Sequence, residues 1–258
     1  MSEFVEVCEQ AARAAGKVLL SWRGRFQVRE KGPSDLVTQA DLESQEAVRA
    51  LVLGAYPDHA FLSEEEPHRP PVGGYRWIVD PLDGTMNYVH GLHGYCVSIA
   101  LERDGEVLVG TVYEPEHDTC YVAQRGAGAF RNGQRLSVSR AERLDEALVA
   151  VSFPPQVRRT SDEVLNFLEV LETCRGVRRL GSAALNLAYV AAGQLDAFWA
   201  TETHAWDIAA GVLLVSEAGG TVTSLSGGPI DFARPKFVAA ATPDLNAVLR
   251  GKLRPGVA

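Results

Sequence analysis

The pattern of apolar residues changes near residue 140, and this change limits the folds that the chain can adopt. Before it, two helix-like stretches lead into short apolar segments that turns separate; after it, strand-like and helix-like segments alternate. The first pattern predicts two helices that pack against an antiparallel meander of strands. The alternation of strands and helices in the second part predicts a layered α/β unit. We therefore expect an α/β (α+β) fold with halves at 1–140 and 141–258. They should pack tightly, because the sequence has no linker or repeat between them.

The first half is predicted to open with two helices. Apolar residues recur at three- and four-residue steps from Phe4 to Trp22, which is the spacing of an amphipathic helix. A polar loop through 31–34 should follow, and then a second helix from Thr38 to about Tyr56. The rest is predicted to form strands that meet at hairpin turns such as Asp104-Gly105 and Asn132-Gly133, at 77–80, 96–101, 107–113, 121–123 and 126–130.

The second half is predicted to alternate between strands and helices, with Gly219-Gly220 ending a helix. The strands are expected at 147–151, 197–200, 221–223 and 237–240, and the helices at 162–173, 182–192 and 208–218.

Net charge, cysteine spacing and the lack of long apolar runs limit the partners, the disulfides and the location that the chain can have. The formal net charge of -8 opposes direct binding to nucleic acid, which needs basic patches. It does not exclude an anionic substrate, because a bound divalent cation can reverse the field of an acidic pocket. The four cysteines are far apart, so we expect reduced thiols and no disulfide framework. The N-terminus does not resemble a signal peptide and no apolar run is long enough for a membrane span, so a cytoplasmic protein is expected.

The run Asp80-Pro81-Leu82-Asp83-Gly84-Thr85 is a candidate for chemistry because it directly follows a predicted strand. Two carboxylates three residues apart in a turn can bracket a divalent cation, and Mg²⁺ also accepts backbone carbonyls such as that of Leu82. Gly84 lets the backbone approach an anion, and Thr85 adds a hydroxyl. The same run also makes a good turn without any metal, and alone it does not decide between the two.

Other acidic positions are ambiguous by themselves. Glu64 and Glu65 follow an apolar pair, where a side chain can point into a cleft, although a run of acids is usually a solvated face. Asp207 precedes an apolar helix, so it can cap that helix, bind a metal beside a phosphate, or do both. Asp41 lies early in a helix, where the helix dipole favours an acid in any case. His204 is close enough to Asp207 to line a pocket, and a structural role fits it equally well.

Taken together and in order, these motifs resemble the inositol monophosphatase family of lithium-sensitive, metal-dependent phosphatases. The matching segments cover nearly the whole chain, at 35–41, 63–65, 77–85, 110–113, 126–133, 181–184, 204–211 and 217–220. The resemblance implies an αβαβα layered sandwich of the inositol monophosphatase and fructose-1,6-bisphosphatase type, built as a homodimer. It also implies hydrolysis of a small polyol or sugar phosphate, inositol 1-phosphate first, by metal-activated water with Mg²⁺ as cofactor and Li⁺ as inhibitor.

The resemblance implies a set of metal ligands. One Mg²⁺ would be held by Glu64, Asp80 and the Leu82 carbonyl. A second would be held by Asp80, Asp83 and Asp207, and Glu64 would help to hold a third, weaker ion. Two metals close together neutralise phosphate charge and lower the pKa of the attacking water, which requires acidic rather than basic ligands.

The resemblance also implies which groups prepare the water. Thr85 would be hydrogen-bonded to Asp41 and, together with Glu64 and Glu65, would orient and deprotonate the attacking water. Lys31 lies on the polar loop that closes over the site in the family.

The implied substrate contacts come from both halves. The amides of Gly84 and Thr85 would hold phosphate oxygens, and His204 and Asp207 would complete the wall. The alcohol would face a short run that consists of Gly181, Ser182, Ala183 and Ala184.

One departure from the family concerns the substrate. Ala200 stands where the family has a glutamate that contacts inositol hydroxyls, and Glu202, two residues later, can replace it. Fructose 1,6-bisphosphate, histidinol phosphate and 3'-phosphonucleotides therefore stay open as substrates. A regulatory, partner-binding protein is the alternative of another class.

Overall fold

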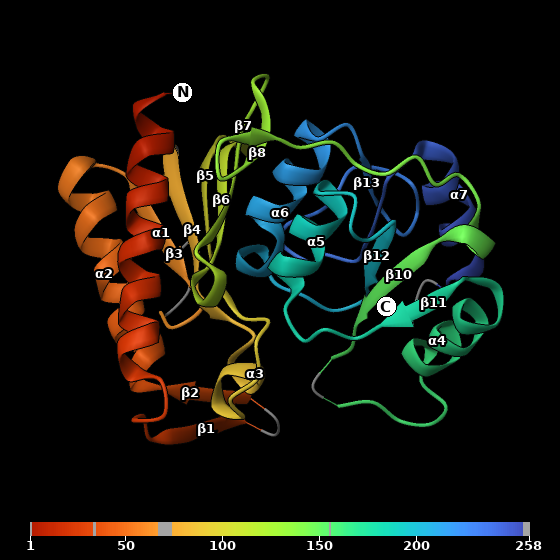
Figure 1. Cartoon of the computed structure of the whole chain (residues 1–258), viewed down its shortest axis with the longest axis horizontal. Coiled ribbons are helices and arrows are strands. Elements are labelled where there is room, and N and C mark those ends of the chain that lie inside the picture. Colours follow the sequence, from red (N-terminus) through yellow and green to blue (C-terminus); the bar gives the residue numbers. More distant parts are fainter. Residues whose placement is uncertain (1, 33–34, 67–73, 155, 255–258) are drawn as a thin grey trace.

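Five layers of secondary structure stack along the long axis of the molecule (Figure 1). This computed structural model describes residues 2–32, 35–66, 74–154 and 156–254, with the backbone alone for 31, 32 and 35. A helix pair covers a seven-stranded sheet, a second helix pair lies between this sheet and a five-stranded sheet, and a third pair covers the far face. The αβαβα layered sandwich expected from the sequence is confirmed.

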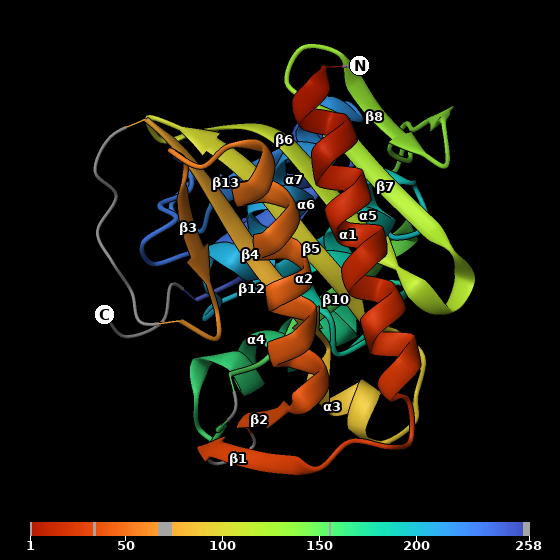
Figure 2. The same ribbon diagram turned by 90° about the vertical axis from the view of Figure 1, so that its left-hand side faces the viewer.

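The outer pair consists of α1 (Glu3–Trp22) and α2 (Gln39–Ala55), which lie side by side over the large sheet (Figure 2). Both confirm predicted helices. The buried face of α1 is rich in small residues, and Gly16 comes so close to the sheet that a Cβ there would lie 2.4 Å from the Tyr113 ring. At the start of α2, Thr38 is the N-cap and its hydroxyl accepts a hydrogen bond from the amide of Ala40 at 3.1 Å.

The large sheet has the order β3-β4-β5-β6-β7-β8-β9. Its strands are β3 (Ala60–Ser63), β4 (Tyr75–Asp83), β5 (Cys96–Arg103), β6 (Glu106–Glu114), β7 (Thr119–Gln124), β8 (Gly128–Arg131) and β9 (Gln134–Arg135). From β4 onward the pairs are antiparallel, and the two predicted hairpin turns are confirmed by positive φ angles at Asp104, Gly105, Asn132 and Gly133. The prediction of a purely antiparallel meander is wrong at one edge, because β3 runs parallel to β4.

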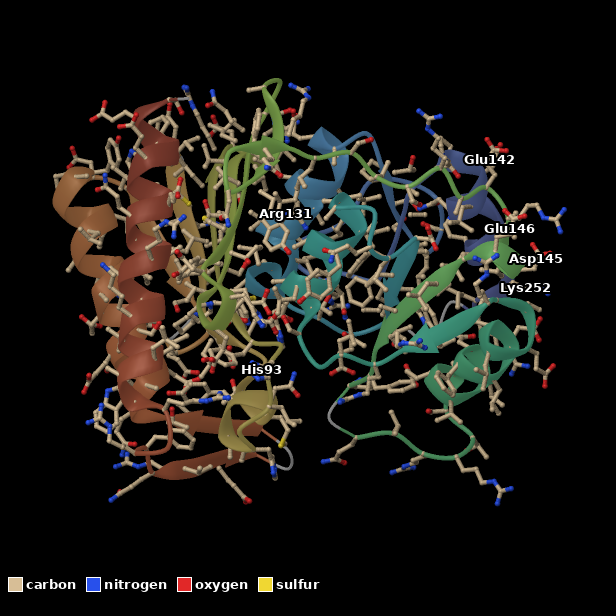
Figure 3. The ribbon with its side chains drawn as sticks, viewed as in Figure 1. His93, Arg131, Glu142, Asp145, Glu146 and Lys252 are labelled. Carbon is tan, nitrogen blue, oxygen red and sulfur yellow. The ribbon has the colours of Figure 1, made fainter. Side chains whose placement is uncertain are left out.

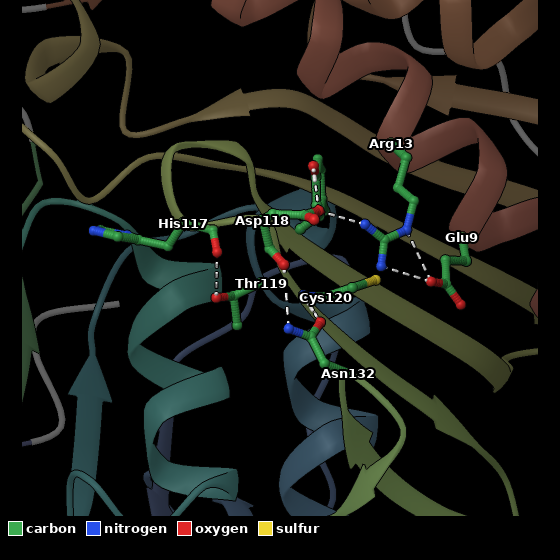
Figure 4. A network of polar contacts seen from close by, with 8 residues as sticks. Glu9, Arg13, His117, Asp118, Thr119, Cys120 and Asn132 are labelled. Carbon is green, nitrogen blue, oxygen red and sulfur yellow. Dashed lines mark hydrogen bonds and ion pairs between the residues drawn. The ribbon is translucent and has the colours of Figure 1, made fainter.

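A polar network fastens α1 to the turn between β6 and β7 (Figure 4). The Arg13 guanidinium donates to Glu9 Oε1 at 2.9 Å and to Asp118 Oδ1 at 2.6 Å. The Asn132 amide then joins this turn to the next hairpin, since its oxygen accepts from the Cys120 amide at 2.8 Å and its nitrogen donates to Asp118 O at 3.2 Å.

The small sheet has the order β11-β10-β12-β14-β13, with the first three strands parallel. Its strands are β10 (Leu148–Ser152), β11 (Gly176–Arg178), β12 (Ala197–Ala200), β13 (Thr221–Ser224) and β14 (Phe237–Ala240). The helices of this half are α4 (Asp162–Thr173), α5 (Ala183–Ala191), α6 (Ala205–Glu217) and α7 (Pro243–Lys252). The alternation predicted for the second half is confirmed, whereas the division into halves at 1–140 and 141–258 that pack as one unit stays a prediction.

Several short elements differ from the prediction. The expected loop at 31–34 is flanked by a hairpin of β1 (Val28–Gly32) and β2 (Asp35–Thr38), whose polar sequence lacks the apolar alternation of a buried strand. The helix α3 (Thr85–Val89), the strand β11 and the helix α7 were not predicted, and α6 begins three residues before the predicted Ile208. The 3₁₀ turns at Pro115–His117 and Leu144–Glu146 complete the elements.

The two middle helices are apolar on nearly all sides because each is covered by both sheets. The approach of α6 to β6 is especially close: a Cβ on Gly110 would lie 2.8 Å from Ala210 Cα. Near the start of α6, Ser98 Oγ on β5 donates to Trp206 O at 3.2 Å. These contacts bring the N-terminus of α6 to the end of β4. Within the described segments, no helix is both long and apolar enough to cross a membrane.

Candidate active site

A cavity of about 300 Å³ opens where the two halves of the chain meet. It is bounded by the end of β4, the start of α3, and the N-termini of α5 and α6. The lining residues include four acids that the sequence predicts as metal ligands, namely Glu64, Asp80, Asp83 and Asp207.

The end of β4 is irregular, and this irregularity points two of the acids the same way. In the pairing with β5, Asp80 faces Ser98 and Asp83 faces Cys96, so two residues of β4 stand against one of β5. Side chains three apart on a regular strand point to opposite faces, and one extra residue cancels that reversal. Asp80 Oδ1 also accepts from the Leu82 amide at 3.0 Å, which holds the bulge.

Gly84 turns the chain from β4 into α3 with a φ of 93°. A Cβ at this position would lie 2.8 Å from Gly94 O, so both the angle and the space require glycine. The Thr85 hydroxyl donates to Leu82 O at 2.9 Å. The expected bond between Thr85 and Asp41 is therefore not formed: Asp41 Oδ2 accepts instead from the amide and hydroxyl of Thr38, at 2.8 and 2.7 Å.

The N-terminus of α5 is joined to Asp83. The Asp83 Oδ2 atom accepts from Ser182 Oγ at 2.6 Å and from the Ala184 amide at 2.7 Å. The preceding segment is fixed by Asn87, whose Nδ2 donates to Gly94 O and to Leu180 O, both at 2.8 Å.

The N-terminus of α6 supplies the acid from the second half. Asp207 lies at the third helical position, and its Oδ2 accepts from the His204 amide at 2.7 Å. The His204 ring lies 3.7 Å from the same oxygen and stacks on Trp206, with ring centroids 4.6 Å apart. Asp207 therefore caps the helix and lines the cavity at once, as the sequence allowed.

Burial and the neighbouring acids disfavour the ionised forms of Asp80 and Asp83. Burial, and then the charges of Glu64, Asp83 and Asp207, raise the pKa of Asp80 well above its usual value. Burial, followed by the charge of Asp207, raises the pKa of Asp83 to about 7. Among the described residues, no basic side chain forms an ion pair with Asp80 or Asp83.

This donor set fits a hard divalent cation, because it consists of oxygens with excess negative charge and a nearby backbone carbonyl at Leu82. In the described part of the chain, no three acidic, histidine or cysteine side chains converge closely enough to form a complete metal cluster. The fit therefore rests on the chemistry and charge of the donors.

The structure places most of the predicted site residues around the cavity: Glu64, Asp80, Leu82, Asp83, Gly84, Thr85, Gly181, Ala183, Glu202, His204 and Asp207. Ser182, Ala184 and Ala200 are buried and are not among the lining residues, so their role as substrate contacts stays a prediction. Asp41 is also buried, and Glu65 is close enough for its charge to contribute to raising the pKa of Asp41 to about 6, after burial. The side chain of Lys31 lies outside the described residues.

Several lining residues were not predicted. Ser152 is the last residue of β10 and Phe153 and Pro154 follow it, Arg179 follows β11, and Thr203 comes after β12. These are neighbouring parallel strands, and ligands commonly bind beyond the carboxyl ends of such strands. The alternating pattern of the second half could have indicated this edge. Trp206 also lines the cavity.

His93 lies in the segment between α3 and β5 (Figure 3) and is not among the lining residues. Its ring centroid is 5.4 Å from that of His117.

Known proteins match this chain over nearly its whole length. The sequence profile of the inositol monophosphatase family matches residues 1–256. An inositol-1-monophosphatase of Mesorhizobium japonicum is 42% identical, covering 98% of this chain and 97% of its own. A fructose-1,6-bisphosphatase/inositol-1-monophosphatase of Aquifex aeolicus is 38% identical, covering 86% of each chain. The crystal structure of the extragenic suppressor protein suhB from Bartonella henselae superposes with a TM-score of 0.93 at 39% identity, covering 99% of this chain and 100% of the other.

Proposed function

The chain belongs to the inositol monophosphatase family, and from that premise we propose that it hydrolyses the phosphate monoester of a small polyol, inositol 1-phosphate first, with Mg²⁺ as cofactor. The observation that carries this proposal is the gathering of four acids around one cavity, with no ion-paired base at Asp80 or Asp83 among the residues that the structure describes. An acidic site of this kind can accept an anionic phosphate only when cations reverse its field.

The proposed ligands for Mg²⁺ are Glu64, Asp80, Asp83, Asp207 and the Leu82 carbonyl, which could hold two ions and a third, weaker one. When bound, the ions neutralise phosphate charge and make water a better nucleophile. A bound cation would also favour the ionised forms of Asp80 and Asp83, because it would offset the burial and the repulsion between acids that raise both pKa values.

The chain's own groups would hold the phosphate and the water. The amides of Gly84 and Thr85 are expected to donate to phosphate oxygens, at a turn where glycine lets the backbone come close. The Thr85 hydroxyl, which is fixed by its bond to Leu82 O, would orient the attacking water. Glu64 and Glu65 would take up the proton that the attacking water loses. Asp41 would support them through the interaction of its charge with that of Glu65.

The alcohol of the substrate is proposed to face the second half. Because Ala200 is buried, recognition of hydroxyl groups would fall to Glu202, Thr203 and His204, which line the cavity. A cytoplasmic location, a homodimer and inhibition by Li⁺ stay predictions.

A second substrate, fructose 1,6-bisphosphate, is favoured by one observation. Arg179 lines the cavity beyond β11, where a guanidinium could bind a second phosphate in two-point fashion. The Aquifex aeolicus relative carries both activities in its name.

Phosphate release from a substrate panel tests the proposal. Inositol 1-phosphate, fructose 1,6-bisphosphate, histidinol phosphate and 3'-phosphoadenosine 5'-phosphate would each be measured with Mg²⁺, with EDTA and with added Li⁺. We expect Mg²⁺-dependent release that is fastest for inositol 1-phosphate. No release from any of the four by folded protein in Mg²⁺ would move the proposal to the partner-binding alternative.

Substitution of Arg179 tests the second substrate. Arg179→Ala should raise KM for fructose 1,6-bisphosphate by about 10- to 100-fold, since a charged hydrogen bond to phosphate is lost, and should change KM for inositol 1-phosphate less than about threefold. Arg178→Ala is the matched control, because Arg178 is the exposed neighbour and does not line the cavity. Equal effects on both substrates would reject a specific role for Arg179.

A further inference from the structure

Two residues at the start of α5, Ser182 and Ala184, contact Asp83 and are not among the residues that line the cavity. Ser182 is 1% exposed and Ala184 is fully buried, whereas the neighbouring Gly181 and Ala183 line the cavity. We propose that Ser182 is a positioning residue, which holds the Asp83 carboxylate in the orientation that a metal ion requires and does not touch the substrate. This inference rests on the proposed function.

The hydrogen bonds of Ser182 leave its hydroxyl with no proton for a substrate. Its Oγ donates to Asp83 Oδ2 at 2.6 Å, and a hydroxyl has only one hydrogen to donate. The same oxygen accepts from the Leu185 amide at 3.1 Å and is therefore the cap of α5. Cys96 Sγ, at 3.6 Å, covers it from the sheet.

These hydrogen bonds fix the plane of the Asp83 carboxylate. Its Oδ2 accepts from Ser182 and from the Ala184 amide, and Cys96 Sγ lies 3.9 Å from the same oxygen. With Oδ2 occupied on the buried side, Oδ1 is the oxygen that can serve the cavity. Partners of this kind orient a metal ligand before the ion arrives, and their loss typically lowers metal affinity or activity by about 10- to 100-fold.

The hydrogen bond between Ser182 and Asp83 also joins the two halves of the chain. Asp83 ends β4 in the first half, while Ser182 begins α5 in the second. Asn87 holds the segment before Ser182 through its bond to Leu180 O at 2.8 Å, and a Cβ on Gly181 would lie 2.8 Å from the same Asn87 amide nitrogen. Ser182 is therefore placed by packing that leaves it little freedom to turn toward the cavity.

Metal binding by capping variants tests the inference. Binding of Mn²⁺ alone, without substrate, would be measured by calorimetry and electron paramagnetic resonance for the wild type, Ser182→Ala and Ser182→Thr. The matched control is Thr242→Ala, because Thr242 also caps a helix, accepting from the Leu245 amide at 3.2 Å and donating to Ala141 O at 3.0 Å, and does not line the cavity.

We expect Ser182→Ala to weaken Mn²⁺ binding by about 10- to 100-fold and to lower kcat at limiting Mg²⁺. KM for inositol 1-phosphate at saturating Mg²⁺ should change less than about twofold, because no substrate contact is lost. Ser182→Thr keeps the hydroxyl and should bind Mn²⁺ within about threefold of the wild type, and Thr242→Ala should bind it normally.

Wild-type affinity for Mn²⁺ in Ser182→Ala would overturn the inference, and a raised KM alone would make Ser182 a substrate contact. An equal loss in Thr242→Ala would reduce the effect to general destabilisation and overturn it too. If Ser182→Ala does not fold, Ser182→Cys gives the same comparison with a weaker donor. A wild-type protein that binds no Mn²⁺ would reject the proposed function itself, whereas equal binding by wild type and variant rejects only the role of Ser182.

Discussion

At the residue scale, a local feature of the backbone sets the direction in which each acidic side chain points. A bulge turns Asp80 and Asp83 to the same side of β4, and a left-handed glycine at Gly84 follows at once. A helix cap fixes Asp207 through the His204 amide. The site therefore depends on backbone geometry as much as on the identity of its acids.

Thr85→Ala should lower kcat by roughly 10²-fold and raise KM by less than about threefold. The hydroxyl is held by Leu82 O, where it could orient water but adds little to binding of the substrate ground state. Steady-state kinetics on inositol 1-phosphate at saturating Mg²⁺ would measure both constants. A higher KM with kcat unchanged would instead identify Thr85 as a binding residue, and Thr85→Ser is the control that should retain most of the activity.

Asp41 should make the protein less stable as pH rises. Burial is the main cause that raises its pKa to about 6, so the folded state binds a proton more tightly than the unfolded state does. Its favourable contribution to the free energy of unfolding is complete below about pH 4 and is lost as pH rises through about 6.

Asp41→Asn keeps an oxygen that can accept from Thr38, and it removes this titration. We expect the variant to be more stable than the wild type by about 1–3 kcal/mol at pH 8, and the difference to fall below about 1 kcal/mol at pH 4. Denaturant unfolding across this range measures both. A difference that does not vary with pH would contradict the raised pKa of Asp41.

At the scale of elements, close packing of small residues brings the helix termini to the strand ends. Gly110 on β6 lies against the backbone of α6, and Gly211 on α6 lies against Leu187 of α5. Both contacts would be opened by a side chain. The two middle helices therefore reach the end of β4 because their neighbours are small.

Gly110→Ala should destabilise the fold by about 1–3 kcal/mol, because a Cβ at 2.8 Å from Ala210 Cα forces α6 away from the sheet. Activity should fall as well, since Asp207 moves with the helix. Gly54→Ala is the control, because Gly54 lies in α2 with nothing within 4 Å of an added Cβ, and it should leave stability equal or slightly higher. Thermal unfolding of both variants would show the contrast, and equal stability for Gly110→Ala would reject the packing argument.

The long elements could be predicted from the sequence, whereas the short ones around the site could not. Apolar periodicity indicated α1, α2 and the antiparallel strands, because a long amphipathic pattern repeats several times. The bulge in β4, the short helix α3 and the burial of Ala200 depend on contacts with β5 and with the small sheet, which no local pattern records. The sequence could therefore single out Asp80 and Asp83 as candidates that can face the same side, but it could not show the bulge through which they do so.

At the scale of the whole molecule, the site is shared between two sheets. Glu64, Asp80 and Asp83 come with the large sheet, and Asp207 comes with a helix that both sheets cover. Bound cations would therefore join the halves as well as complete the site. The repulsion among the acids is greatest when no cation is present.

Mg²⁺ should accordingly stabilise the protein. An ion that binds only the folded state at about 100 times its dissociation constant adds about 2.7 kcal/mol, or roughly 5–10 °C in melting temperature for a chain of this size. Scanning calorimetry with Mg²⁺ and with EDTA would measure the shift, and a matched concentration of KCl controls for ionic strength. An identical melting temperature in all three would contradict binding at this cavity.

The most direct test of the central claim, that these acids form a Mg²⁺-dependent phosphatase site, is Mg²⁺-dependent phosphate release by Asp83→Asn. The control is Asp104→Asn, an exposed acid at a turn with a φ of 53°, which asparagine adopts readily. We predict that Asp83→Asn stays folded and loses activity on inositol 1-phosphate by about 10²-fold or more at every Mg²⁺ concentration, while Asp104→Asn matches the wild type. Full activity in a folded Asp83→Asn protein would contradict the account.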